Sequence, residues 1–368
     1  MKLEIEKKDL LNLIGKTQNI VEKRNTMPVL VNVLLEAQDE QLKVFATDLE
    51  VSLTDETKVK VSSPGKVAVS AKSLFEIAKK LSDGPIQLIK KDNHWLEIKQ
   101  GKYLSKIVGV SADDYPIFPT YNPQSFLKIS AQILKEMIDK TIYSVSNDET
   151  RYHLNGVFFE MNTNFGFKMV ATDGHRMSLI SRNPGSLKSS LGQGVIIPRK
   201  GLYEVKKILE GINDEIEIAI EGSQFILKHE STLLMIRLIE GKYPNYQQFI
   251  PNKLSHKVSL KRESFLMSLE RVSLLANQKS KAVLLNLSKG KIEISSNNPE
   301  LGDAKEEIEI DYTGQDIKIG FNAKYMMDIL TSMNNDTIDL ELNDQLSPGL
   351  MRPQGDQSYT CVVMPMRI

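Results

Sequence analysis

The feature that most constrains this chain is an internal repeat with a period of about 125 residues. The stretch Phe45–Leu49 (Phe-Ala-Thr-Asp-Leu) recurs as Val170–Gly174 (Val-Ala-Thr-Asp-Gly), 125 residues later. Another 125 residues on, Ser296–Asn298 ends an expected strand in the same way. Because a pattern that returns at a fixed period marks a repeated structural unit, the 368 residues are expected to hold three copies of one fold.

Two further markers return with nearly the same spacing. The first is a short strand that runs into a helix, and its copies are Val69–Ile77, Ile197–Val205 and Phe321–Ile329. The lysines of these copies, Lys72, Lys200 and Lys324, are 128 and 124 residues apart. The second marker is Asp114–Pro116, which matches Lys242–Pro244 at an offset of 128. Each opens a stretch rich in proline and aromatic residues, which is typical of a linker.

Each repeat opens with an alternating strand that leads into an amphipathic helix. In the first repeat Lys2–Glu6 alternates, and apolar residues follow at helical spacing: Leu10, Leu11, Ile14 and Ile20. Ser130 and the stretch Arg262–Ser264 are candidates to cap the corresponding later helices.

Between the helices the alternation of apolar and polar residues predicts strands, among them Val29–Glu36, Val157–Glu160 and Lys291–Ser295. We therefore predict an α+β fold of three similar domains, each with two helices packed on antiparallel sheets of about eight strands. The expected bounds of the domains are 1–122, 126–248 and 252–368.

Composition excludes several classes of protein. The single cysteine, Cys361, rules out an internal disulfide and a multi-cysteine zinc site, so neither metal nor cofactor is expected. No stretch approaches about 18 consecutive apolar residues, so no membrane span is expected. The alternating N-terminus does not resemble a signal peptide, and a reducing cytoplasm fits the cysteine count.

The net charge of zero, taken alone, argues against a nucleic-acid-binding protein. However, the six expected helices sum to +10 and the remaining residues to −10; the helix segments are 7–24, 70–82, 130–141, 199–210, 261–281 and 323–333. If these helices share one surface, that surface suits phosphates without reading bases. The other interpretation is that lysines merely solvate exposed helix faces, and the sequence leaves both open.

Seven short stretches, in unchanged order along the whole chain, resemble the bacterial DNA polymerase III β subunit (β sliding clamp) family. They are Arg151–Val157, Ala171–Met177, Ile197–Gly201, Gly241–Tyr246, Asn297–Glu300, Ile319–Asn322 and Val362–Ile368. The resemblance implies three similar domains per chain and a head-to-tail homodimer that closes into a ring. Helices would line the hole, and sheets would form the outer wall.

The resemblance also implies a function without intrinsic catalysis. Such a ring encircles double-stranded DNA independently of sequence and tethers a polymerase to it, after a clamp loader has placed it there. By position, the residues implied for DNA binding are Arg24, Lys72, Arg199 and Lys200. Asp148 stands where some relatives carry a polar amide that touches DNA, and an acid there would repel phosphate.

A second site implied by the resemblance is a pocket for short linear peptides of the polymerase III α subunit, other polymerases, the loader and repair proteins. The matching positions are Leu154, Thr172, Gly174, His175, Arg176, Met177, Pro244, Leu346, Val362, Met364, Pro365 and Met366. Apolar side chains would accept an anchor residue, while His175 and Arg176 would hold polar groups of the peptide. Gln248 stands where some relatives have arginine.

The sequence also assigns edges for the ring contact, mostly from the resemblance. Strands at His94–Ile98, which includes Trp95, and at Tyr103–Val110 would offer one sheet edge, and the segment 268–288 would offer the complementary edge.

Parts of the sequence also fit two functions other than a clamp. The run Asp173-Gly174-His175 suggests a catalytic acid and base, but a nucleophile, an orienting group and oxyanion donors would also have to converge. A repeat-built scaffold without DNA function would share the repeats and the pocket, and would differ from a clamp in lacking a basic surface.

Overall fold

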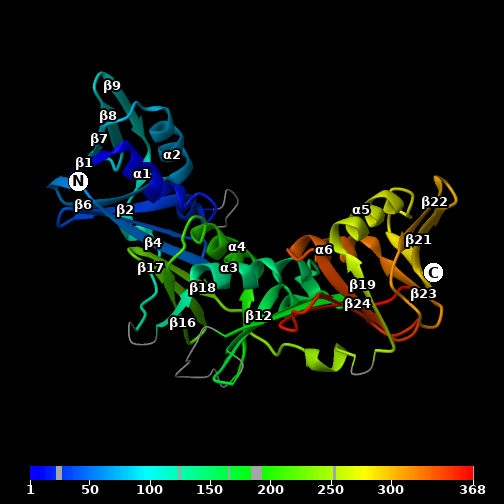
Figure 1. Cartoon of the computed structure of the whole chain (residues 1–368). Coiled ribbons are helices and arrows are strands. Elements are labelled where there is room, and N and C mark those ends of the chain that lie inside the picture. The colour runs from blue at the N-terminus through cyan, green and yellow to red at the C-terminus, as the bar shows by residue number, and fades with distance from the viewer. Residues whose placement is uncertain (22–26, 123–125, 165, 184–192, 252–253, 368) are drawn as a thin grey trace. The chain divides into compact units, whose positions relative to one another are not determined.

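The computed structural model describes residues 1–21, 27–122, 126–164, 166–183, 193–251 and 254–367. It divides into two compact units (Figure 1). Unit 1 comprises Met1–Gln132 and Lys200–Leu238, and unit 2 comprises Ile133–Arg199 and Ile239–Ile368. No helix among the described residues is long and apolar enough to cross a membrane.

The described elements repeat the order strand, helix, strands three times. The first repeat contains β1 (Lys2–Glu6), α1 (Lys7–Gly15), η1 (Pro28–Val31), β2 (Asn32–Gln38), β3 (Gln41–Thr47), β4 (Val51–Lys58), β5 (Lys60–Ser63), β6 (Gly65–Ser70), α2 (Ala71–Lys80), β7 (Pro85–Lys90), β8 (Leu96–Gln100), β9 (Tyr103–Ile107), β10 (Gly109–Val110) and η2 (Ala112–Asp114). The second contains β11 (Leu127–Ser130), α3 (Ala131–Asp139), η4 (Ile142–Ser144), η5 (Glu149–Leu154), β12 (Gly156–Asn162), β13 (Gly166–Thr172), β14 (Arg176–Arg182), β15 (Val195–Pro198), α4 (Arg199–Ile208), β16 (Glu215–Glu221), β17 (Gln224–His229), β18 (Thr232–Arg237) and η6 (Tyr246–Phe249). The third contains β19 (His256–Lys261), α5 (Arg262–Ser273), β20 (Ala282–Ser288), β21 (Lys291–Asn298), β22 (Gly302–Glu309), β23 (Ile317–Asn322), α6 (Ala323–Ser332), β24 (Thr337–Leu342), β25 (Gly349–Pro353) and β26 (Tyr359–Val363).

The larger of the two sheets in unit 1 contains strands of both the first and the second repeat. One sheet has the order β5-β1-β7-β8-β9, and the other has the order β10-β6-β2-β3-β4-β18-β17-β16-β11. In the second sheet β4 pairs antiparallel with β18, so that Leu53 lies opposite Leu234. Since an unpaired strand edge exposes its backbone donors and acceptors, this pairing both satisfies them and joins the two repeats.

Unit 2 joins the second and third repeats in the same way. Its larger sheet has the order β15-β12-β13-β14-β26-β25-β24-β19, and its smaller sheet has the order β22-β21-β20-β23. β14 pairs antiparallel with β26, and Met177 lies opposite Val362. β26 is therefore an interior strand, and all five of its residues are buried, the polar Thr360 included.

The helices cover the sheets with their apolar faces. α1 packs against α2, and α5 packs against α6. In the first repeat Leu10, Ile14 and Leu74 are fully buried together with strand residues such as Leu35 and Val44. Spacings of three and four residues place these side chains on one helix face, as the sequence predicted.

Two expected helices end earlier than the sequence indicated. α1 stops at Gly15 rather than at residue 24, and the hydroxyl of Thr17 donates to the carbonyl oxygen of Ile14 at 2.8 Å. A hydroxyl that bonds the local backbone in this way competes with continued helix. Ile20 is buried, but it lies in a turn rather than in the helix. α5 stops at Ser273, short of the expected residue 281.

The shorter helices reduce the charge segregation. Over the six observed helices the net charge is +5, not +10, because basic residues such as Lys279 and Lys281 lie beyond the helix ends. Lys16 also lies beyond α1, and its ammonium group pairs with the buried carboxylate of Asp55 at 2.7 Å. The basic character of the helices is therefore real but half as large as predicted.

Several local predictions were also wrong. Residues 28–31 form the 3₁₀ helix η1, with Pro28 at its start, so the expected strand begins only at Asn32. His94 has a φ of +64° and lies in a turn before β8, while Trp95 is partly exposed. Arg262 is already the first residue of α5, and the residue before it makes no side-chain cap.

One of the expected interface edges is not an edge. β20 lies between β21 and β23, so its backbone is paired on both sides, and the outer strands of that sheet are β22 and β23. β9 is an outer strand of its sheet, as predicted, whereas β8 is interior. The apolar run of β20 is thus explained by burial in the sheet rather than by contact with a partner.

Candidate functional site

Three residues of the implied pocket meet in one apolar cluster of unit 2. Leu154, Met177 and Val362 are buried there, on η5, β14 and β26 respectively. The other buried members, which the sequence had not assigned to the site, are Val170, Ile196, Tyr243, Tyr246 and Leu350. We call these eight residues the apolar cluster.

The linker after β18 closes one side of the apolar cluster. The ring of Tyr243 stacks on Phe158 with centroids 4.8 Å apart, and Pro244 next to it is half-buried. The hydroxyl of Tyr246 donates to a carboxylate oxygen of Glu160 at 2.5 Å. Burial raises the pKa of Tyr246, so the phenol stays protonated and keeps this hydrogen bond. The repeated Tyr-Pro motif was the sequence feature that could have pointed to this wall.

A tight turn joins β13 to β14 directly before Met177, and we call residues 172–176 the Thr-Asp turn. The hydroxyl of Thr172 donates to the carbonyl oxygen of Arg176 at 2.6 Å, and the amide of Gly174 donates to Thr172 Oγ1 at 3.1 Å. Asp173 Oδ1 accepts from the amides of His175 and Arg176 at 2.9 and 3.0 Å. Gly174 has a φ of +88°, a conformation that glycine adopts without strain.

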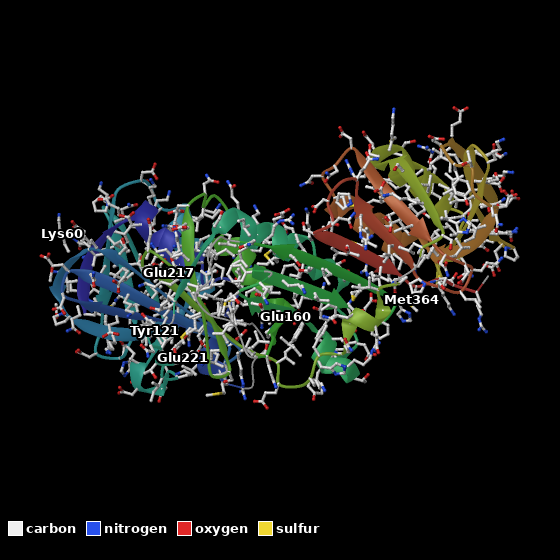
Figure 2. All side chains as sticks on the ribbon, turned by 60° about the horizontal axis from the view of Figure 1, so that its bottom comes forward. Lys60, Tyr121, Glu160, Glu217, Glu221 and Met364 are labelled. Carbon is white, nitrogen blue, oxygen red and sulfur yellow. The ribbon has the colours of Figure 1, made fainter. Side chains whose placement is uncertain are left out.

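The chain after β26 completes an exposed apolar rim. The amide of Met364 donates to the carbonyl oxygen of His175 at 2.9 Å, which fixes Met364 beside the Thr-Asp turn. Met364, labelled in Figure 2, is partly exposed, with 37% of its surface accessible to solvent; Pro365 is half-buried, and Leu346 is 69% exposed. A polarizable, unbranched methionine at such a rim can adapt to different apolar partners.

Met366 does not join the apolar cluster. Its amide donates to the carbonyl oxygen of Gly320 at 2.8 Å. It lines a different cavity of about 490 Å³, together with polar residues such as Asn277, Ser295 and Asn297.

Arg176 has a different role from the one the sequence suggested. Its side chain is only 8% exposed, and its nitrogen atoms are engaged within the protein. Nε donates to Asp173 at 3.1 Å, Nη1 to Asp328 at 2.6 Å, and Nη2 to the carbonyl oxygen of Tyr143 at 2.6 Å. An arginine bound in this way shapes the Thr-Asp turn, and it does not present its guanidinium to a ligand.

A buried polar network under β14 and β26 was missed by the sequence interpretation. The hydroxyl of Ser178 donates to Tyr143 Oη at 2.6 Å, and Tyr143 Oη lies 2.9 Å from Tyr359 Oη and 3.4 Å from Cys361 Sγ. Burial raises the pKa of both tyrosines and of the Cys361 thiol, so all three remain neutral. No spacing in the sequence connects these residues, because strand pairing brings them together.

The residues implied for DNA binding are not equivalent in the structure. Arg24 lies outside the described residues. Lys72 is exposed on α2. Arg199 donates to the side chain of Asn147, and the Lys200 ammonium lies 2.6 Å from the buried carboxylate of Asp48. A phosphate at Lys200 would therefore compete with an existing ion pair.

The two departures from the family pattern are both on the surface. Asp148 caps η5 and pairs with Arg151 at 2.9 Å, which offsets its charge. The pKa of Asp148 is lowered, mainly by hydrogen bonds from Thr150. Gln248 is exposed in η6.

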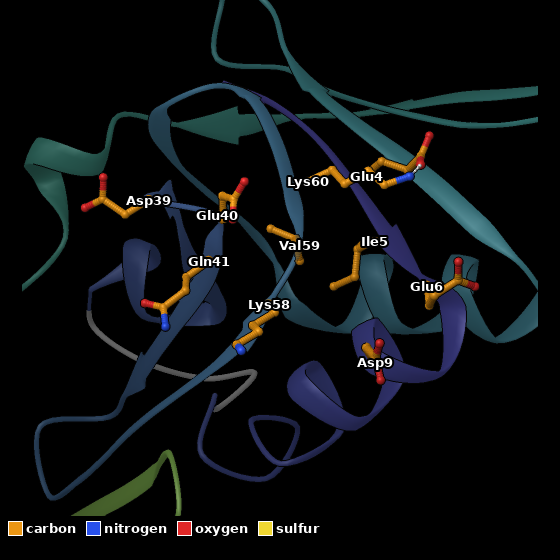
Figure 3. Close-up of a pocket in the computed structure, with 10 residues that line it drawn as sticks. All are labelled: Glu4, Ile5, Glu6, Asp9, Asp39, Glu40, Gln41, Lys58, Val59 and Lys60. Carbon is orange, nitrogen blue, oxygen red and sulfur yellow. Dashed lines mark hydrogen bonds and ion pairs between the residues drawn. The ribbon is translucent and has the colours of Figure 1, made fainter.

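A cavity of about 450 Å³ in the first repeat contains none of the predicted site residues (Figure 3). Its lining is acidic: Glu4, Glu6, Asp9, Asp39 and Glu40 outnumber Lys58 and Lys60. Lys60 pairs with Glu4 at 3.2 Å. Such a lining would repel phosphate, so this cavity does not extend the DNA site.

In the described part of the chain, the run Asp173-Gly174-His175 is not arranged as an active site. The carboxylate of Asp173 is used by the backbone of its own turn and by Arg176. No group of three or more His, Cys, Asp or Glu in the described part of the chain could hold a metal ion.

Comparison with known proteins decides the family. The family model for the DNA polymerase III beta subunit N-terminal domain matches residues 1–119, the central-domain model matches 128–245, and the C-terminal-domain model matches 247–367. The chain belongs to the DNA polymerase III beta subunit family. Members of this family are sliding clamps, processivity factors of DNA replication that have no catalytic activity of their own.

Individual relatives cover the whole chain. The beta sliding clamp of Caulobacter vibrioides is 32% identical over 100% of both chains, and that of Pseudomonas putida is 31% identical over 100% of both. Among solved structures, the Bacillus subtilis DNA polymerase sliding clamp matches with a TM-score of 0.96 at 29% identity, covering 100% of this chain and 99% of that one. A Pseudomonas aeruginosa sliding clamp bound to griselimycin matches with a TM-score of 0.94 at 30% identity over 100% of both chains. The resemblance and the three-domain clamp fold are thereby confirmed.

An acid-sensitive ion pair links α3 to β14 in unit 2. Arg182 contacts both carboxylate oxygens of Glu136, at 2.6 and 2.9 Å, and Lys140 contacts Glu136 at 2.7 Å. The hydrogen bond from Arg182, ahead of that from Lys140, lowers the pKa of Glu136 to about 2. A depressed carboxylate pKa contributes stability above the unfolded-state pKa, and that contribution is lost as pH falls toward the folded-state value.

We therefore predict that Glu136→Gln lowers the free energy of unfolding at pH 7 by about 1–2 kcal/mol, a figure reduced for the partial exposure of the pair. The difference between variant and wild type should shrink between pH 5 and pH 2, because wild-type Glu136 becomes protonated there. Urea unfolding at several pH values measures this difference in the free energy of unfolding. A difference that is constant with pH would show that the pair contributes through packing alone.

Proposed function

We propose that two copies of this chain associate head to tail and close into a ring around double-stranded DNA. The three domains would occupy residues 1–122, 126–248 and 252–368. The observation that carries this proposal is the pair of sheet edges formed by β9 in unit 1 and β22 in unit 2. Each is an outer strand of its sheet, and such edges invite another chain to pair with them.

The chemistry of the two edges is complementary. The hairpin of β8 and β9 carries Lys99, Lys102 and Lys106 against one acidic side chain, Glu97, together with the half-exposed Tyr103 and Leu104. β22 carries four acidic side chains, which are Asp303, Glu306, Glu307 and Glu309, against one lysine. Contacts between unlike surfaces of identical chains close into a ring when the rotation allows it. Opposite charge favours pairing of β9 with β22 and disfavours pairing of two like edges.

Retention on DNA would be topological rather than adhesive. A closed ring leaves DNA only at an end or by opening, so weak phosphate contacts are sufficient and permit sliding. We assign such contacts to Arg24, Lys72, Arg199 and Lys200. Arg199 and Lys200 would contact phosphate while also keeping their present partners, Asn147 and Asp48 respectively. A clamp loader would open the ring, and the complex would act in the cytoplasm.

The apolar cluster with Met364, Pro365 and Leu346 is proposed to bind short linear peptides. Candidate ligands are segments of the polymerase III α subunit, other polymerases, the loader and repair proteins. The cluster offers an apolar floor, and the amides of the Thr-Asp turn are already satisfied, so an apolar anchor side chain fits it best. The related clamp that binds griselimycin suggests this compound as a probe. Tethering through such a peptide would raise the local polymerase concentration to about the millimolar range.

Topological retention is tested on a nicked circular plasmid loaded with a clamp loader. The protein should survive a high-salt wash on the circle and leave once the plasmid is cut. Release from both forms alike would contradict the ring, provided that a control clamp loads with the same loader. Arg24→Ala combined with Lys72→Ala should reduce loading, whereas Lys60→Ala, an exposed lysine beside Glu4, should not.

The dimer contact is tested by Leu104→Asp. Burying a carboxylate at the β9 edge should weaken dimerisation by at least about tenfold. Ile117→Asp is the matched control, since Ile117 is exposed and lies outside the edge. Analytical ultracentrifugation over a concentration series measures the dimer dissociation constant. Equal values for the two variants would place the interface elsewhere.

The peptide groove is tested by Met364→Asp, which should weaken binding of fluorescently labelled griselimycin by at least about tenfold. Met267→Asp changes a methionine of similar exposure on α5 and should leave binding unchanged. Fluorescence anisotropy gives both affinities. Unchanged binding by the Met364 variant would remove this rim from the site.

A further inference from the structure

Among the residues that the structure describes, the lysine at the second position of each repeated helix has an acidic partner in two of the three repeats. Lys72, Lys200 and Lys324 hold this position on α2, α4 and α6. In unit 1, Lys200 pairs directly with Asp48, the aspartate of the turn after β3. In unit 2, the equivalent aspartate is Asp173 of the Thr-Asp turn, and its connection to the helix lysine is longer.

That longer connection is a chain of four charged side chains. Asp173 pairs with Arg176 at 3.1 Å, and Arg176 Nη1 lies 2.6 Å from Asp328 Oδ2. Lys324 Nζ lies 2.8 Å from the same Oδ2 and 3.1 Å from Oδ1. Asp328 is therefore shared between one buried cation, Arg176, and one cation whose side chain is 61% exposed, Lys324.

The contacts of Arg176 and His175 bind the Thr-Asp turn to α6. The Arg176 guanidinium lies 4.6 Å from the ring centroid of Tyr325 and 5.4 Å from that of Tyr143. The His175 ring also stacks on Tyr325, with centroids 6.4 Å apart. Because the carbonyl oxygen of His175 accepts from the amide of Met364, a change at α6 reaches the exposed rim of the groove through one turn.

We propose that Asp328 couples phosphate binding at Lys324 to the affinity of the peptide groove. A phosphate that takes the Lys324 ammonium leaves the Asp328 carboxylate to Arg176 alone, which strengthens the buried pair and holds the Thr-Asp turn more firmly in its groove-forming conformation. This inference rests on the proposed function, because it uses DNA phosphate as one ligand and an apolar peptide as the other. Linkage is reciprocal, so peptide in the groove also strengthens phosphate binding by the same factor.

The expected effect is small, because Lys324 is largely exposed and water screens its charge. We expect a saturating short DNA duplex to tighten griselimycin binding about threefold at low salt, and the gain should fade as salt rises. Asp328 and Arg176 act here as positioning residues, since neither is required to touch the ligand.

The test measures anisotropy of labelled griselimycin on the full-length protein, with and without the duplex. Lys324→Met should bind the probe about as tightly without DNA as the wild type does with it, and should show no further gain. Asp328→Asn should bind more weakly and should also lose the response to DNA. Lys279→Met removes an exposed lysine of unit 2 that lies beyond α5, and it should behave as wild type.

The outcomes separate this coupling from the proposed function. A duplex effect of equal size in wild type and Lys324→Met would overturn the coupling while leaving the groove and the ring in place. A wild-type protein that fails to bind the probe would overturn the groove assignment and the coupling with it. If Asp328 has a purely structural role, Asp328→Asn should bind the probe more weakly but keep the response to DNA. That result would also overturn the coupling.

Discussion

Antiparallel pairing between strands of neighbouring repeats is the interaction on which the rest of this structure depends. β4 pairs with β18 and β14 pairs with β26, so each long sheet contains strands from two repeats. The apolar cluster and the exposed Met364 beside it depend on the second pairing, which sets Met177 opposite Val362 and places the segment after β26 beside the Thr-Asp turn. The two smaller sheets keep outer strands of their own, and the proposed ring contact uses β9 from one of them and β22 from the other.

The polar groups at the seam of the second and third repeats show how this pairing is kept in register. Tyr143, Ser178 and Tyr359 exchange hydrogen bonds in a buried position, and Arg176 is fully engaged beside them. A buried polar group without a partner costs about 1–3 kcal/mol, so a slip of one residue would be strongly disfavoured. This network therefore adds specificity to a seam whose apolar contacts alone would tolerate rearrangement.

Much of the fold could be predicted from the sequence, because the repeat fixed the number of domains and the helical spacing fixed the buried faces. Helix ends were less predictable. The end of α1 depends on a hydrogen bond from the Thr17 hydroxyl to the backbone. Because the helices are shorter than expected, their summed net charge is half of the predicted value. β20 was mistaken for an edge because an apolar strand looks the same in sequence whether a sheet or a partner buries it.

Some features of the candidate site could likewise be predicted from the sequence, and others could not. The sequence by itself determined the three-fold repeat, the family and the apolar character of Leu154, Met177 and Val362, since these depend on local pattern. Only the tertiary structure decided that Arg176 is a buried link between the Thr-Asp turn and α6, and that Lys200 is already paired with Asp48. A charged side chain has the same sequence signature whether it faces solvent, a ligand or a carboxylate. Its partner is chosen by strand pairing and helix packing between residues far apart in the chain.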